Sequence, residues 1–172
     1  PASTDDSAMI VNGLNLLRAA PIANMETTKL KSGGVSYGLA ECGYDVRILD
    51  DVRFIYDPEG RKVTYVGNHV FDGHAVLVNV MELFQMPTDL VGIGYNKSSW
   101  NRKQLQINQP VIEPGWRGVL TLGLVYSGNV PLYVPAGSGI MQVIFTRLES
   151  QAEYTGRYQD QRSEIVPSIT LK

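Results

Sequence analysis

The sequence predicts a mainly β protein, a sandwich or barrel in which strands far apart in the chain pair with one another. From residue 32 onward, short runs rich in Val, Ile, Tyr and Leu are interrupted about every 8 to 12 residues by Gly, Pro, Asn or Asp. Two strong turn signals, residues 57–60 (Asp-Pro-Glu-Gly) and residues 127–129 (Ser-Gly-Asn), separate such runs. Between residues 119 and 126, successive side chains would point to opposite faces of a strand.

One short helix is predicted before the strands, near residues 5–19. Residues 3–6 (Ser-Thr-Asp-Asp) offer N-cap oxygens and early negative charge. Pro21 ends the pattern because proline cannot continue a helix. The apolar positions of this helical pattern are Ile10, Val11, Leu14, Leu16 and Leu17.

The remaining chain shows no boundary between domains, so we expect one domain over residues 1–172. The stretch between His69 and His74 is predicted to be a loop, and the spacing of these histidines does not match a common zinc site. From residue 149 the apolar periodicity is lost, and residues 153–172 are predicted to form an arm, a lid or a mobile tail. The predicted strands are residues 44–49, 52–56, 62–66, 74–79, 90–95, 119–126, 132–134 and 140–145.

Composition excludes several classes of function. A formal net charge of -2 gives no general attraction to nucleic acid or to an anionic membrane. No apolar run approaches the ~20 residues that span a bilayer, and no signal-peptide pattern opens the sequence. Cys42 is the only cysteine, which excludes an intrachain disulfide and a cysteine-rich metal site. We therefore expect a cytoplasmic protein.

Polar chemistry is concentrated between residues 96 and 129. Ser98 and Ser99 are adjacent hydroxyl donors between the bases Lys97 and Arg102, and charge-assisted donors of this kind can cradle a polyphosphate. The alternative is a solvated polar loop. Glu113 precedes a Pro-Gly turn, where its carboxylate can take a proton from water or can cap nearby amides.

Six short motifs follow one another along the chain, at residues 43–45, 86–92, 97–102, 111–118, 134–137 and 139–145. In their order and spacing they resemble the dCTP deaminase and dUTPase superfamily, and the deaminase branch more than the dUTPase branch. The resemblance covers roughly residues 35–165. It implies a dUTPase-like distorted β-barrel or jelly roll with a short N-terminal helix and a C-terminal arm or lid. It also implies a deoxynucleoside triphosphate ligand and a homotrimer with its sites between subunits.

The resemblance also assigns roles to residues of the serine loop and the arm. Lys97 stands where the superfamily usually has arginine, and lysine keeps the charge but loses the bidentate fork. Asn101 stands where alanine is usual. The lid of the deaminase branch implies that Tyr158 and Gln161 lie near the pocket wall and the base. The residues implied to bind phosphate are Lys97, Ser98, Ser99, Arg102, Gln142 and Arg157.

Glu113 and Trp116 match the turn at the sugar end of the superfamily's pocket. The superfamily usually has aspartate where this sequence has Glu113, and in the dUTPase branch that acid orients the water that attacks the α-phosphorus. The position of Trp116 implies an aromatic ring near the deoxyribose. The alternative for Trp116 is a core or interface residue.

Gly123 is the main departure from the deaminase branch. The branch has its catalytic glutamate at this position, and removal of a 4-amino group needs a carboxyl that moves protons between water, base and leaving ammonia. Glycine has no such group. It also leaves space beside the base for a larger pyrimidine or for a neighbouring chain.

The sequence therefore favours Mg²⁺-dependent hydrolysis of a deoxypyrimidine triphosphate, dUTP or dCTP with a plain or modified base, to monophosphate and pyrophosphate. Mg²⁺ would be held through the substrate's phosphates and not by a metal site of the protein. Two alternatives stay open. One is deamination of dCTP with a relocated carboxylate, Glu82, Glu149 or Glu153. The other is a non-catalytic nucleotide-binding or regulatory homotrimer.

Overall fold

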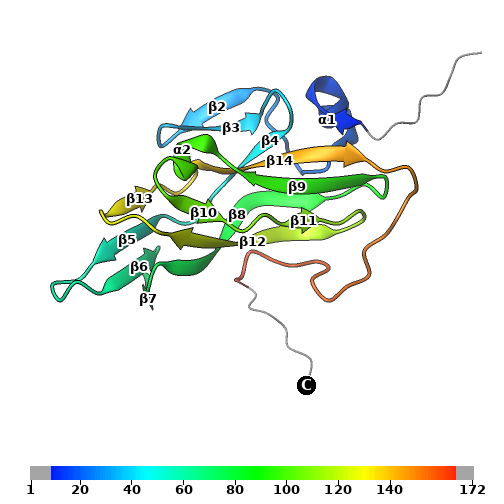
Figure 1. Cartoon of the computed structure of the whole chain (residues 1–172). Helices are drawn as coiled ribbons and strands as arrows, with labels where there is room; N and C mark the ends of the chain where they lie inside the picture. The colour runs from blue at the N-terminus through cyan, green and yellow to red at the C-terminus, as the bar shows by residue number, and fades with distance from the viewer. Residues whose placement is uncertain (1–8, 166–172) are drawn as a thin grey trace, which may run out of the picture.

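The computed structural model describes residues 9–165, which form three antiparallel sheets (Figure 1). The first contains, in spatial order, β11 (Val111–Ile112), β9 (Leu90–Asn96), β14 (Gly139–Arg147), β4 (Tyr44–Arg47), β3 (Val35–Leu39) and β2 (Lys29–Ser32), with β1 (Ile10–Val11) also paired to β14. The second contains β10 (Leu105–Ile107), β12 (Arg117–Tyr126) and β8 (Ala75–Gln85). The third contains β13 (Leu132–Val134), β5 (Val52–Tyr56), β6 (Lys62–Val66) and β7 (His69–Asp72).

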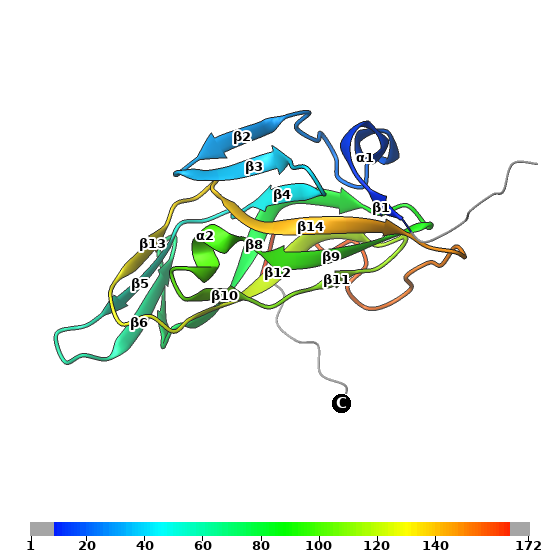
Figure 2. The ribbon, with the colours of Figure 1, turned by 45° about the horizontal axis from the view of Figure 1, so that its top comes forward.

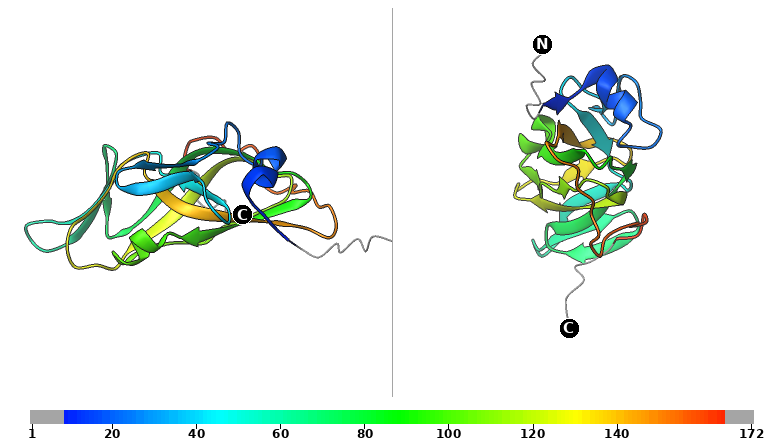
Figure 3. Two further views of the ribbon diagram at one scale, coloured as in Figure 1. Left: turned by 90° about the horizontal axis from the view of Figure 1, so that it is seen from above. Right: turned by 90° about the vertical axis from the view of Figure 1, so that its right-hand side faces the viewer.

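The molecule is elongated. The third sheet projects from one end, and α1 (Gly13–Ala19) lies toward the other end, beside β14 (Figure 2). Seen from above and from the side, the sheets are stacked against one another (Figure 3). The sheets of the described residues do not close into a barrel, and their arrangement fits a jelly roll. The predicted mainly β class is confirmed.

The core lies between the sheets, and strand β12 shows why the sequence folds this way. From Thr121 onward the alternation is as predicted: Leu122 and Leu124 are buried, whereas Thr121 and Gly123 lie on the outer face. A register shift between Val119 and Thr121 buries Val119 as well. Burial of each such apolar side chain contributes roughly 1.5–3 kcal/mol.

The predicted N-terminal helix exists but begins later than expected. Residues 10 and 11 are not helical; they form β1, in which Ile10 pairs with Thr146 and Val11 with Phe145. Pairing with an available strand edge outweighs a helical pattern that Gly13 already weakens. Helix α1 ends at Ala19, and its C-cap residue Ala20, directly before Pro21, has a left-handed φ of 47°. The N-cap predicted at residues 3–6 lies outside the described residues.

All eight predicted strands are present, three of them (52–56, 62–66 and 132–134) with the predicted bounds and five with altered bounds, but the predicted loop after His69 is wrong. Residues 69–72 form β7, whose side chains are all exposed, and it pairs with β6 from Val66↔His69 to Val63↔Asp72. An exposed edge strand has no buried face, so its sequence carries no alternation to detect. The short strands β1, β2, β3, β10 and β11 were also not predicted.

The C-terminal segment is an ordered arm as far as residue 165. It runs beside the start of β12, where Val119 N donates to Gln161 O at 2.9 Å and Asp160 N donates to Arg117 O at 2.8 Å. Trp116 Nε1 donates to Tyr158 O at 2.7 Å. The arm therefore lies along its own chain; residues 166–172 of the predicted arm are outside the described part.

Both described helices are short. Helix α1 has seven residues and α2 (Ser98–Asn101) has four. Within residues 9–165, no helix has the length and apolar character needed to cross a bilayer.

Candidate functional site

The predicted serine loop lines a polar pocket of about 360 Å³. Helix α2 follows the end of β9, so its first residues lie beside the neighbouring strands β14 and β4. Four of the six predicted phosphate-binding residues meet here: Lys97, Ser98, Ser99 and Gln142. The other lining residues are Lys29, Ser36, Asp45 and Asn96.

Helix α2 is held in place by Trp100. This side chain is 2% exposed, and its Nε1 donates to Gly139 O on β14 at 2.7 Å. Ser98 and Ser99 precede it on the same turn and are exposed. The buried indole therefore fixes a short helix that presents two hydroxyl groups at the mouth of the pocket.

Lys97 is not available as a free cation in the isolated chain. Its Nζ forms an ion pair with Asp45 Oδ2 and donates to Ser36 Oγ at 3.1 Å. The exposed fractions of the Lys97 and Asp45 side chains are 10% and 3%. The second carboxylate oxygen, Asp45 Oδ1, is buried and has no hydrogen-bond partner among residues 9–165. Lys97 is thus neutralised within the chain, while one acceptor oxygen remains unsatisfied beside it.

The two predicted arginines lie elsewhere. Arg102 is exposed at the end of α2 and lines a separate depression of about 400 Å³, together with Tyr126 and residues 128–132 between the end of β12 and the start of β13. Arg157 is an exposed residue of the arm. Neither lines the serine-loop pocket, so one chain alone does not assemble the predicted phosphate site.

Glu113 and Trp116 lie on the turn between β11 and β12, in different surroundings. Glu113 is exposed, and its carbonyl accepts from Trp116 N at 3.2 Å. Trp116 is 6% exposed and packs on Phe84, with 6.1 Å between ring centroids. Its indole also holds the arm through Tyr158 O. In this arrangement Trp116 packs in the core and anchors the arm.

Gly123 is covered by a side chain that the sequence did not reveal. Asn108 N donates to Gly123 O at 2.9 Å. A Cβ atom at position 123 would lie 2.5 Å from Asn108 Nδ2, so the carboxamide fills the space that a side chain at 123 would take. The predicted gap is therefore occupied by the same chain. Position 108 carries only a weak signal in the sequence, a short polar run before Pro110.

The outer face of β12 beside Gly123 carries amides and hydroxyls. Gln161 Nε2 donates to Thr121 Oγ1 at 2.5 Å, and Thr121 Oγ1 donates to Asn79 Oδ1 at 2.8 Å. This relay holds Gln161, predicted to lie near the base, at Thr121, two residues before Gly123 on the strand. Tyr158, predicted to lie near the pocket wall, is partly buried, and its amide donates to the Tyr154 hydroxyl at 3.3 Å.

The three carboxylates considered as replacements for a catalytic glutamate lie in other places. Arg47 Nε and Arg47 N donate to the two oxygens of Glu82, each at 2.8 Å. Burial raises the pKa of Glu82, against the lowering effect of Arg47. Glu149 and Glu153 are exposed. Within residues 9–165, no hydrogen bond joins any of the three to Asn108, Thr121 or Gln161.

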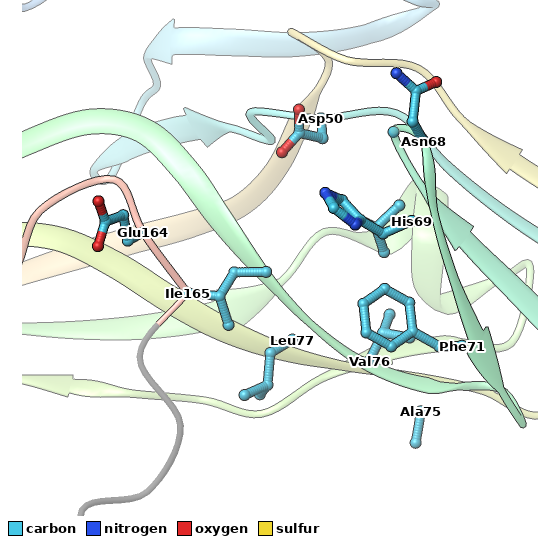
Figure 4. A pocket seen from close by; sticks show the side chains of 11 residues that line it. Asp50, Asn68, His69, Phe71, Ala75, Val76, Leu77, Glu164 and Ile165 are labelled. Carbon is cyan, nitrogen blue, oxygen red and sulfur yellow. The ribbon is translucent and has the colours of Figure 1, made fainter.

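A second, apolar pocket, of about 870 Å³, contains none of the predicted site residues (Figure 4). Phe71 and Leu77 contribute apolar surface, and Asp50, His69 and Glu164 lie around it. These three do not form a metal site, because residues 9–165 contain no group of three or more His, Cys, Asp or Glu side chains placed to hold a metal ion.

Comparison with known proteins gives consistent matches. A family model described as dCTP deaminase-like matches residues 36–148. A protein of Sulfurovum sp. named dCTP deaminase is 32% identical, over 80% of this chain and 82% of the relative. A protein of the same name from Nautilia profundicola is 28% identical, over 86% of this chain and 89% of the relative.

A solved structure has the same fold. It is 2'-deoxycytidine 5'-triphosphate deaminase from Agrobacterium tumefaciens, which aligns with a TM-score of 0.54 at 17% identity. The alignment covers 81% of this chain and 48% of that chain.

Proposed function

This chain belongs to the dCTP deaminase-like family, as its motifs predicted, and from that premise we propose that it hydrolyses a deoxypyrimidine triphosphate to monophosphate and pyrophosphate. The observation that carries the proposal is the contrast between two surfaces. The serine loop keeps a pocket lined by hydroxyls. The outer face around Gly123 carries amides and hydroxyls where deamination would need a carboxyl.

Deamination fits this face poorly. Attack of water at C4 of cytosine needs a group that accepts a proton from water and delivers protons to the ring and to the leaving ammonia. The Asn108 carboxamide beside Gly123 can donate and accept hydrogen bonds, but it does not exchange protons as a carboxyl does. Loss of such a proton shuttle typically costs about 10²–10⁴-fold in rate.

Hydrolysis at the α-phosphorus has fewer requirements. A water oxygen bonds to the α-phosphorus, the bond from that phosphorus to the bridging oxygen breaks, and pyrophosphate leaves. Glu113 is the proposed acceptor of the proton from water, because its side chain is exposed on the turn between β11 and β12 and can reach a water molecule. Ser98 and Ser99 would donate to phosphate oxygens and hold the chain of phosphates in line.

The residues present fit a Mg²⁺ ion that is shared with the substrate. Mg²⁺ is commonly bound by one or two carboxylates together with substrate phosphates and water. Asp45 Oδ1 is a buried carboxylate oxygen without a partner among residues 9–165, and Asp45 lines the pocket of the serine loop. Asp45 and the phosphates would hold the ion, which revises the expectation that the phosphates alone hold it, and the ion would supply charge neutralisation on the phosphoryl oxygens.

A homotrimer with shared sites is part of the proposal. Arg102 and Arg157 do not line the pocket of their own serine loop. Copies arranged around a three-fold axis can bring such residues to a neighbour's pocket. The arginines would then supply the positive charge that Lys97 cannot supply, because Asp45 neutralises it.

The direct test is product analysis. The protein is incubated with dCTP, dUTP and the other deoxynucleoside triphosphates plus Mg²⁺, and monophosphate, pyrophosphate and ammonia are measured. We expect monophosphate and pyrophosphate from dUTP or dCTP. The Glu113→Gln variant should lose hydrolysis and keep nucleotide binding, whereas Glu59→Gln, at an exposed turn, should behave as wild type. An active Glu113→Gln variant would exclude Glu113 as the base.

Deamination of dCTP is the second candidate, favoured by the name of the relatives. Its signature in the same experiment is dUTP with released ammonia, without pyrophosphate. Binding of nucleotides without any turnover would instead identify a non-catalytic, regulatory protein.

A further inference from the structure

We propose that Asn108 contacts the pyrimidine base and lets one site accept both 4-amino and 4-oxo pyrimidines. The inference rests on the proposed function, because it assumes that a deoxypyrimidine nucleotide binds beside Gly123. It goes further by naming the residue that reads the base and the substrate class that follows from it.

The backbone around Asn108 is fixed by three neighbours. Asn108 N donates to Gly123 O at 2.9 Å, and Ile107 N donates to Asn96 Oδ1 at 3.0 Å. Pro110 O accepts from Gly94 N at 3.0 Å. These bonds connect the segment to β12 on one side and to β9 on the other. The position of residue 108 is therefore set by the sheets and not by a flexible loop.

The Asn108 side chain, in contrast, is exposed and forms no hydrogen bond to another described residue. It lies over Gly123, with Nδ2 2.5 Å from the place of a Cβ atom at that position. A fixed backbone with an unengaged carboxamide is the arrangement expected of a group that awaits a ligand. The polar group that β12 lacks at Gly123 is supplied from the neighbouring segment.

Gln161 complements Asn108 because its orientation is set. Gln161 Nε2 donates to Thr121 Oγ1 at 2.5 Å, and that hydroxyl donates onward to Asn79 Oδ1 at 2.8 Å. The Nε2 of Gln161 is thus engaged, and its oxygen is the group left to accept a hydrogen bond from a ligand. Asn108 can turn either its oxygen or its nitrogen, because a rotation about its last torsion exchanges the two.

This difference matters for the two pyrimidine types. Cytosine presents a 4-amino donor next to an acceptor at N3, and uracil presents a 4-oxo acceptor next to an N3–H donor. A carboxylate accepts only, so it would favour the 4-amino base and repel the 4-oxo base. A carboxamide that can rotate serves both. We therefore expect similar affinities for dCTP and dUTP.

The test is equilibrium binding of the α,β-imido analogues of dCTP and dUTP to the full chain. Wild type should bind both. Asn108→Asp should shift the affinity ratio toward the dCTP analogue by roughly tenfold, the size expected for a hydrogen bond to a charged group. Asn108→Ala should weaken both analogues to a similar extent. Asn24→Asp, which makes the same change at an exposed turn, should leave the ratio unchanged.

Thermal unfolding of each variant establishes that the fold is kept, which the exposure of Asn108 leads us to expect. If wild type binds both analogues and the Asn108 variants keep wild-type affinities and ratio, Asn108 does not contact the base. If neither analogue binds wild type, the proposed function fails, and this inference fails with it.

Discussion

Asp45 on β4 and Lys97 at the end of β9 form a buried ion pair across β14, the strand that separates them. Gln142 of β14 lies between the two, since it pairs with Asp45 on one side and with Tyr95 on the other. The pair therefore fixes the start of the serine loop to the first sheet. It also neutralises Lys97, one of the two lysines that line the pocket of the serine loop.

Removing the acid of this pair should destabilise the protein. Asp45→Asn leaves the Lys97 ammonium buried without its counter-charge, which typically costs about 3–5 kcal/mol. Urea unfolding of wild type and variant measures this loss. Glu41→Gln, which disrupts the exposed pair with Lys29, is the matched control and should have a much smaller effect. Equal stability of Asp45→Asn and wild type would show that the ion pair does not support the fold.

The arm should loosen when Trp116 loses its indole nitrogen. Trp116→Phe removes the hydrogen bond from Trp116 Nε1 to Tyr158 O, an effect worth about 0.5–1.5 kcal/mol. Hydrogen exchange at the amides of residues 159–161 should become faster. Trp100→Phe is the control, because it removes a similar 2.7 Å bond to Gly139 O without touching the arm. Equal acceleration in both variants would mean that Trp116 does not hold the arm specifically.

Glu82 should make the protein less stable as pH rises through the mildly acidic range. Burial raises the pKa of Glu82 above its ordinary 4.5, so the folded state keeps this proton to higher pH than the unfolded chain does. The free energy of unfolding contributed by Glu82 therefore falls between pH 4.5 and the raised pKa. Glu82→Gln should remove this contribution. Urea unfolding of both proteins across that range tests it, and parallel pH profiles would contradict the assignment.

A glutamate introduced at position 123 should support deamination only if the Asn108 side chain no longer occupies the space beside it. In Gly123→Glu the new Cβ meets Asn108 Nδ2 at 2.5 Å, so the carboxamide must move. Gly123→Glu combined with Asn108→Ala should release more ammonia from dCTP than Gly123→Glu alone. The rate of ammonia release from dCTP, measured for both variants, tests this prediction. If neither variant deaminates dCTP while both bind it, the missing carboxylate is not the reason that deamination is absent.

Much of the fold could be predicted because it depends on local patterns. The alternation around Leu122 and Leu124 is visible in the sequence because one face of β12 is buried. The start of the helix could not be predicted, since the pairing of Ile10 and Val11 with β14 depends on residues far along the chain. Whether such a segment becomes helix or strand depends on its pairing with a distant strand.

The candidate site shows the same division. The serine loop is contiguous, so residues 97–99 could be recognised together and do line one pocket. Asn108 was missed because its importance comes from a contact with Gly123, fifteen residues further on, that no motif encodes. Trp116 matched a motif, but its burial against Phe84 depends on the packing of β8.

The fate of dCTP in ¹⁸O-labelled water is the most direct test of the central claim. The protein is incubated with dCTP and Mg²⁺, and the products are analysed by mass spectrometry. Hydrolysis at the α-phosphorus predicts one ¹⁸O atom in the phosphate of dCMP, unlabelled pyrophosphate and an intact 4-amino group. Formation of dUTP with ¹⁸O at C4 and release of ammonia would contradict the account.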